Sequence, residues 1–120
     1  MTRDDVAAWL TRYVEAWRTY DPELIGSLFS ADAEYRYRPS DEPVVGREAI
    51  VADWLADRDE PGTWQARYEP WAIDGDRVVA SGATRYQDND GGRDYRNVFL
   101  LEFDTDGRCR SFTELWVEER

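Results

Sequence analysis

Glu114 is the acidic residue whose neighbours in the sequence most favour a chemical role. In an extended segment, residues two apart point to the same face, so Glu114 shares a face with Phe112 and Trp116. Apolar surroundings disfavour the charged form of a carboxyl group and raise its pKa toward neutrality, a property of side chains that exchange protons with a substrate. The alternatives are an ion pair with a buried arginine, or a carboxylate at the strand end that reaches water.

The absence of two residue types excludes several kinds of catalytic and binding chemistry. All 15 basic residues are arginines, and the sequence contains neither lysine nor histidine. This excludes Schiff-base chemistry, a Walker-type phosphate loop, hydrolytic triads with a histidine base and histidine-ligated zinc sites. A carboxylate shifted by apolar surroundings is then the ordinary route to a base near neutral pH.

Two further polar groups could orient a substrate oxygen. The hydroxyl of Tyr13, on the apolar face of the first predicted helix, either points into a cavity or finds a partner within the core. Asn97 lies on the inferred inner face of its strand, where a buried amide needs a partner such as a ligand or Glu114. Glu114 and Tyr13 are the candidate catalytic residues. The candidate pocket-lining residues are mostly aromatic: Trp17, Tyr35, Tyr37, Trp54, Asn97, Phe99, Phe112 and Trp116.

Other reactive or metal-like positions have simpler interpretations. Cys109 is the only cysteine, so it cannot form a disulfide within the chain, and it lacks the histidine or second cysteine of a reactive thiol site. The segment Asp88-Asn89-Asp90-Gly91 resembles the start of a calcium loop, but the later ligands are absent and the pattern is typical of a hairpin turn. The sequence predicts neither a metal nor a cofactor.

Three helices are expected in the first half of the chain. Apolar residues recur with helical spacing from Thr2 to about Trp17, and Thr2 with Asp5 forms a capping-box pattern. Asp21-Pro22 is typical of a helix start, and Gly46-Arg47-Glu48 opens a third helix.

The strands are expected mainly in the second half. A first strand is predicted from Asp32 to Arg38, followed by a loop from Pro39 to Val45. Beyond Gly62 the apolar period changes from 3.6 to 2. Four strands joined by Asp-, Asn- and Gly-rich turns are predicted there, at about Trp64–Ile73, Arg77–Tyr86, Arg93–Phe103 and Cys109–Val117. The expected fold class is therefore α+β, a curved antiparallel sheet packed on three N-terminal helices.

Length and charge limit the partners. The 120 residues suit a single domain, residues 1–120, and the apolar fraction of 42% is enough to bury a core. The net charge of −11 opposes binding to nucleic acid or to anionic lipid, and there is no run of about 18 apolar residues for a membrane span. With one cysteine and no signal-peptide pattern, we expect a cytoplasmic protein.

One strand predicts a homodimer. The segment Val98–Phe103 is almost entirely apolar, so both of its faces should be covered, and the helices cover only one. The outer face would be apolar, formed by Val79, Ala83, Val98, Leu100, Leu115 and Val117. A two-fold dimer through this face is the simplest cover.

The order of elements resembles the nuclear-transport-factor-2-like (NTF2-like) fold, and in particular its SnoaL-like branch. The segments that carry the resemblance span nearly the whole chain: Arg12–Trp17 with Tyr20-Asp21-Pro22, Leu28–Ala33, Gly46–Ile50, Gly107–Arg110 and Phe112–Trp116. The resemblance implies a sheet curved around the first helix with a conical pocket. Members of this superfamily use the pocket as an isomerase, cyclase, hydrolase or dehydratase site, or to bind a ligand or partner.

The resemblance does not extend equally to all branches of the superfamily. Tyr13 matches the first-helix tyrosine of the ketosteroid isomerase members, but Tyr37 stands at their base position and Phe99 near their second aspartate. This implies that their mechanism is absent. The polyketide cyclase branch relies on a pocket carboxylate, which Glu114 would supply.

Two classes of function stay open. The first is a cavity that binds a small hydrophobic, ring-containing or polyketide-like molecule, with or without turnover of the lyase, isomerase or cyclase type. The second is a non-catalytic dimeric module whose cavity is filled by its own aromatic side chains. A solvent-connected cavity of about 300 Å³ or more, with convergent polar groups, would favour the first.

Overall fold

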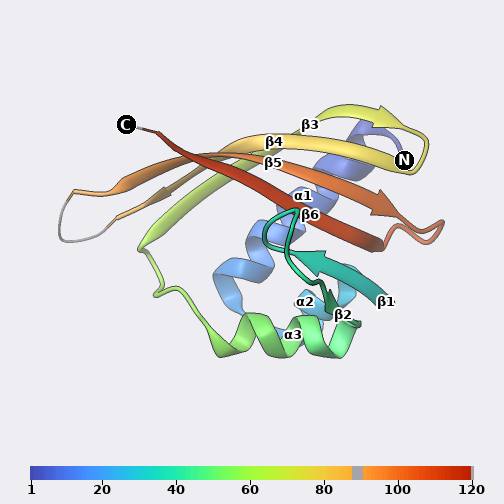
Figure 1. Ribbon diagram of the computed structural model, residues 1–120, viewed down its shortest axis with the longest axis horizontal. Coiled ribbons are helices and arrows are strands. Elements are labelled where there is room, and N and C mark those ends of the chain that lie inside the picture. Colours follow the sequence, from blue (N-terminus) through green and yellow to red (C-terminus); the bar gives the residue numbers. More distant parts are fainter. Residues whose placement is uncertain (88–90, 120) are drawn as a thin grey trace.

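The computed structural model describes residues 1–87 and 91–119 and shows a mixed α+β fold with one curved, unclosed sheet (Figure 1). The elements in chain order are α1 (Arg3–Thr19), α2 (Pro22–Ser27), β1 (Phe29–Arg36), β2 (Val44–Val45), α3 (Arg47–Ala56), β3 (Trp64–Asp74), β4 (Arg77–Tyr86), β5 (Arg93–Phe103) and β6 (Cys109–Glu119). Most of the turn expected at residues 88–91 lies outside the described residues.

The helix starts follow their local sequence signals. The Thr2 hydroxyl accepts a hydrogen bond from the Asp5 backbone N–H at 3.1 Å, and the Asp5 carboxylate accepts one from the Thr2 N–H at 3.0 Å. This confirms the predicted capping box. The start at Asp21-Pro22 is also confirmed, because the Asp21 carboxylate accepts from the Glu23 N–H. Between the two helices, Tyr20 adopts a left-handed conformation with φ 51°, which turns the chain at the end of α1.

The sheet has the strand order β2-β1-β6-β5-β4-β3. The predicted meander is confirmed: β3, β4, β5 and β6 pair in sequence as antiparallel neighbours. One pairing differs, because β1 runs parallel to β6. Hairpin turns set the direction of consecutive strands only. Because β1 ends at Arg36 and β6 begins only at Cys109, no local motif determines their relative orientation.

The first strand and the loop after it also differ from the prediction. The strand begins at Phe29 rather than at Asp32, and the predicted loop contains the short strand β2. The pair Leu28-Phe29 continues the apolar stripe of α2, and a short apolar run fits a buried strand equally well. Long-range pairing decides between the two: Phe29 pairs with Cys109 of β6.

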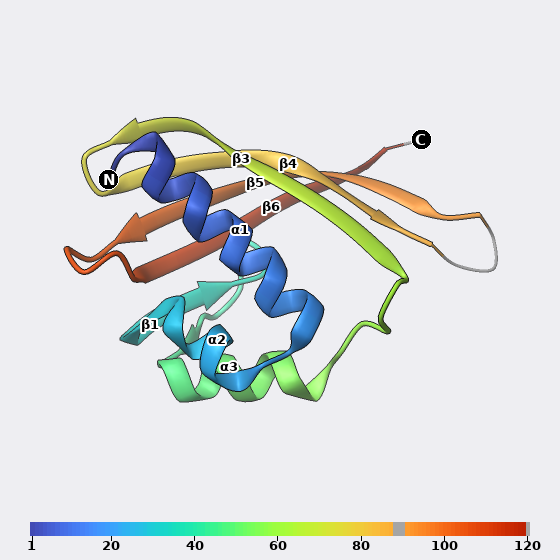
Figure 2. The same cartoon turned by 180° about the vertical axis from the view of Figure 1, so that it is seen from behind.

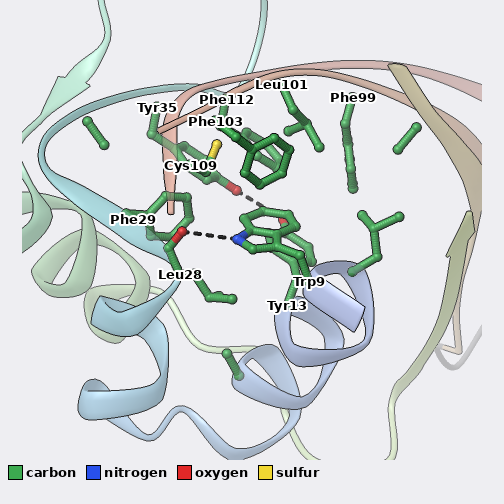
Figure 3. Packing of buried hydrophobic residues seen from close by; sticks show 14 of the residues in the cluster. Trp9, Tyr13, Leu28, Phe29, Tyr35, Phe99, Leu101, Phe103, Cys109 and Phe112 are labelled. Atoms are coloured by element: carbon green, nitrogen blue, oxygen red, sulfur yellow. Dashed lines mark hydrogen bonds between the residues drawn. The ribbon is translucent and has the colours of Figure 1, made fainter. Parts of the chain in front are cut away.

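The helices lie on the concave face of the sheet, and no described helix covers the opposite face (Figures 1 and 2). Trp9 of α1 is central to the buried layer between them. Its indole Nε1 donates to the Leu28 carbonyl oxygen at 3.0 Å, and its ring meets the rings of Phe29 and Phe103 edge to face (Figure 3). This packing fixes the rotation of α1 and so directs Tyr13, one turn later, toward the sheet.

The convex face of the sheet is apolar and exposed. Leu100, Leu115 and Val117 are 45%, 39% and 67% exposed. Cross-strand pairing joins Leu115 to Val98 and Leu100 to Val79, so apolar side chains of β4, β5 and β6 are adjacent on this face. None of the helices in the described part of the chain combines the length and apolar character needed to cross a bilayer.

Candidate functional site

A cavity of about 670 Å³, open to solvent, occupies the concave face between α1, α3 and the sheet. Ten aromatic side chains line it: Tyr13, Trp17, Tyr20, Tyr35, Tyr37, Trp54, Tyr68, Tyr86, Tyr95 and Trp116. The polar and charged residues of the lining are Asp53, Asp57, Asp59, Thr84, Arg93, Asn97 and Glu114. The volume is well above the lower limit of about 300 Å³ for small-molecule pockets.

Glu114 forms part of the wall contributed by β6. Its cross-strand neighbour is Phe99 of β5, and strand alternation puts it on the same face as Phe112 and Trp116. Burial in these surroundings raises its carboxyl pKa from 4.5 to about 7. Among the described residues, no arginine forms an ion pair with Glu114 and no side chain or backbone group hydrogen-bonds to it. The carboxyl group is therefore half-buried and has no partner among the described residues.

Tyr13 and Tyr35 form a pair of hydroxyl groups in the same cavity. Their oxygens are 3.0 Å apart (Figure 3), and burial holds the pKa of both phenols well above the usual value. Both rings stack on Phe112, with centroids 5.4 and 4.3 Å away. In each arrangement of this pair one hydroxyl donates to the other, so one proton stays available to a ligand.

A second hydrogen-bonded chain crosses three strands. The Tyr68 and Thr84 hydroxyl oxygens are 2.6 Å apart, and the Thr84 hydroxyl donates to the Asn97 side-chain oxygen at 2.9 Å. The Asn97 amide nitrogen has no partner among the described residues, so it is available as a donor in the cavity. Gly82 makes room for Tyr68, because a Cβ at Gly82 would lie 2.4 Å from the Tyr68 ring.

At the opening of the cavity, aspartates form hydrogen bonds with tyrosine and tryptophan side chains. The Tyr37 hydroxyl donates to the Asp53 carboxylate, and the Trp17 indole donates to Asp59 at 2.9 Å. The Tyr20 hydroxyl accepts from the backbone N–H of Asp59 at 2.8 Å. These bonds attach α1 and β1 to the C-terminal end of α3.

The structure brings eight of the ten sequence-selected residues to the cavity. Glu114, Tyr13 and Asn97 line it together with the five aromatic residues Trp17, Tyr35, Tyr37, Trp54 and Trp116. Phe99 and Phe112, expected in the lining, lie beneath it and are fully buried. The physical reason is that the rings of Tyr13 and Tyr68, from α1 and β3, pack over these two rings.

Several lining residues were missed by sequence reasoning. Tyr68 and Tyr86 alternate on the inner faces of β3 and β4, so period 2 alone could have identified them. Asp53 and Asp57 are four residues apart, a spacing that places two side chains on one helical face. Tyr20 had no such signal, because its position depends on the left-handed turn after α1.

Cys109 lies outside this site. It is buried at the start of β6, and burial raises the pKa of its thiol to about 12. Within residues 1–87 and 91–119, no group of three or more His, Cys, Asp or Glu side chains is arranged to hold a metal ion.

Comparisons with known proteins agree with this architecture. No curated protein sequence matches the chain. Among solved structures, an NTF-2 like protein of unknown function from Burkholderia xenovorans LB400 is similar in fold, with a TM-score of 0.73 and 18% sequence identity. The alignment covers 98% of this chain and 86% of that one. The fold is therefore NTF2-like, and because the model of the SnoaL-like domain matches residues 10–112, the chain belongs to the SnoaL-like family.

Proposed function

We propose that the protein binds a small, ring-containing organic molecule in this cavity and that Glu114 exchanges a proton with it. The observation that carries the proposal is the unpaired Glu114 carboxyl group in the wall of a solvent-open, aromatic cavity. A partly desolvated carboxyl group without a counter-charge is costly for stability, and such groups are typical of sites that exchange protons. The alternative of a non-catalytic module has less support, because the aromatic side chains leave about 670 Å³ unfilled.

The aromatic walls favour a flat apolar ligand. Rings in the lining offer both faces and edges to a bound ring, and burial of apolar surface contributes about 25 cal/mol per Å². Polar groups converge on the cavity from different elements, which is typical of sites that orient a ligand as well as hold it. The Asn97 amide nitrogen and one hydroxyl of the Tyr13–Tyr35 pair can donate to a ligand oxygen, and the Trp54 indole nitrogen of the lining also has no partner among the described residues.

Glu114 supplies the proton chemistry in this proposal. A pKa of about 7 leaves both the acid and the base form populated at neutral pH. As a base, the carboxylate takes a proton from a carbon next to a carbonyl group, and Asn97 or Tyr13 donates to the oxygen that becomes negative. As an acid, it returns the proton to the same or a different position, which gives reactions of the lyase, isomerase or cyclase type.

A ring-containing ketone with acidic C–H bonds tests both parts of the proposal. With 2-tetralone in D₂O, we expect the protein to speed exchange of the C1 protons at least about 10-fold over Glu114→Gln, measured by NMR. The Glu114→Gln variant should still bind 2-tetralone, since the amide keeps the size but cannot exchange the proton. Glu69→Gln is the matched control, because Glu69 lies exposed on β3 outside the cavity lining. Equal exchange rates in all three proteins would contradict the role of Glu114.

Binding in the cavity has its own test. Ala56 lines the cavity near the end of α3, whereas Ala52, one turn earlier, does not. Ala56→Trp should weaken 2-tetralone binding by about 10-fold or more because the new ring fills the space, while Ala52→Trp should leave it unchanged. Equal affinity in both variants would place the ligand elsewhere.

We further propose that a second copy of the chain covers the convex apolar face. The exposed Leu100, Leu115 and Val117 support this, because leaving them in water loses about 25 cal/mol per Å² of apolar surface. Sedimentation at micromolar concentration should give a dimer, and Leu115→Glu should give a folded monomer. A wild-type protein that sediments as a 14.0 kDa monomer would reject this interface.

A further inference from the structure

The cavity carries more negative than positive groups. Four carboxyl groups line it, and Arg93 is the one cationic side chain among the described lining residues. The Arg93 guanidinium lies 5.8 Å from the centre of the Tyr86 ring and donates to the Tyr95 hydroxyl at 3.3 Å. It has further contacts beyond these, so it is already engaged. An anionic ligand would therefore meet repulsion here, and a cationic one would meet attraction.

Rings of the lining already hold cations. Arg93 lies over Tyr86, and Arg58 lies 5.5 Å from the centre of the Tyr20 ring. The negative face of an aromatic ring attracts a nearby cation, and several rings set at right angles bind an organic ammonium group on more than one side. The charge of this cavity and the chemistry of its walls thus favour the same class of ligand.

Three rings at the opening have the perpendicular arrangement that such binding needs. The Tyr86 and Tyr95 rings are 5.7 Å apart at 86°, and the Tyr95 and Trp116 rings are 5.5 Å apart at 82°. Glu114 precedes Trp116 by two residues on the same face of β6, and its charge reaches the Tyr86 phenol. The half-buried Glu114 carboxyl group, which has no partner among the described residues, therefore lies on the same face of the sheet as these three rings, two of which Arg93 already contacts.

We propose that the ligand of the cavity is an organic cation, an amine or quaternary ammonium compound with an apolar ring body, whose charge lies among Tyr86, Tyr95 and Trp116 against the Glu114 carboxylate. The inference rests on the proposed function, because it uses the same cavity and the same carboxyl group. The two roles of Glu114 are compatible, since the ionised form that pairs with a cation is also the form that accepts a proton.

Binding of a cation should be coupled to release of a proton. A bound positive charge stabilises the carboxylate, so it lowers the pKa of Glu114 from about 7 and displaces its proton. The other groups that face Glu114 are phenols of α1, β1, β3 and β4: Tyr13, Tyr35, Tyr37, Tyr68 and Tyr86, whose pKa values are all raised. The remaining charged lining residues are Asp53, Asp57, Asp59 and Arg93.

Three ligands with the same ring and different charge test the proposal. The probes are (1-naphthylmethyl)trimethylammonium, 1-naphthylmethanol and 1-naphthylacetate, titrated into the full chain by calorimetry at pH 7.5. We expect the cation to bind about 10-fold or more tightly than the alcohol, and the anion to bind weakest. Equal affinity for cation and alcohol would overturn the inference while keeping the proposed function. Absence of binding by all three would contradict both.

Glu114→Gln identifies the carboxylate that pairs with the cation. At pH 6, calorimetry in two buffers of different ionisation enthalpy should show release of about one proton per bound cation for the wild-type protein. Glu114→Gln should release almost none and should lose most of the preference for the cation over the alcohol. Glu69→Gln should behave like the wild type. An unchanged preference in Glu114→Gln would assign the counter-charge to the aspartates and overturn the proposed pairing.

Discussion

The two ends of the concave face are both aromatic but differ in chemistry. At the closed end, the Trp9 ring packs against the rings of Phe29, Phe103 and Phe112. All four phenylalanines of the chain are buried and none lines the cavity, whereas all seven tyrosines line it. A phenol hydroxyl needs a partner or water, which only the open end offers. The comparison shows that phenylalanine is confined to the packed core, whereas every tyrosine reaches the cavity, and Tyr13 and Tyr35 belong to both regions.

The largest expected effect comes from replacing a tryptophan by alanine. The loss of stability should be much greater at the closed end than at the open end. Trp9→Ala removes the indole bond to Leu28 and leaves a cavity, so we expect a loss of about 3–5 kcal/mol in the free energy of unfolding. Trp116→Ala at the opening should lose less than about 1 kcal/mol, because that ring is 46% exposed. Urea denaturation of both variants measures the difference. Similar losses would mean that the open end contributes to the core after all.

The open end should also make stability depend on pH through Glu114. Its pKa is raised from 4.5 to about 7 in the folded protein, so the folded state binds this proton more tightly than the unfolded state does. The resulting stabilisation is complete below pH 4.5 and is lost as pH rises toward 7, with a change on the order of 2–3 kcal/mol. Subtracting the pH profile of Glu114→Gln from that of the wild type isolates this contribution. A flat difference would show that the carboxyl group is solvated.

Adding a hydroxyl group at the closed end, or removing one at the open end, should change stability by a smaller amount. Phe29→Tyr places a hydroxyl group in the closed end without a partner, and we expect a loss of about 2 kcal/mol. The opposite change, Tyr95→Phe at the opening, should stay within about 0.5 kcal/mol of the wild type. Thermal unfolding of the two variants measures both changes in stability. A tolerated Phe29→Tyr would show that the closed end can admit water.

Much of the fold could be predicted because its signals are local. The Thr2–Asp5 capping box and the Asp21-Pro22 start involve residues within three positions of each other. The change of period after Gly62 located the four meander strands to within two residues of their ends. The same alternation predicted that Glu114 faces inward, since residues two apart share a face whatever the strand packs against.

The sequence by itself therefore determined the elements, their hairpin order and the inward side of β6. Only the tertiary structure decided that β1 joins β6 in parallel, that Phe99 and Phe112 lie beneath the lining, and that no described arginine reaches Glu114. Tyrosines from α1, β1, β3, β4 and β5 meet around this carboxyl group only because the sheet curves about α1. Alternation fixes the face on which a side chain lies, whereas the distance across that face follows from sheet twist and helix packing, which depend on contacts distributed along the whole chain.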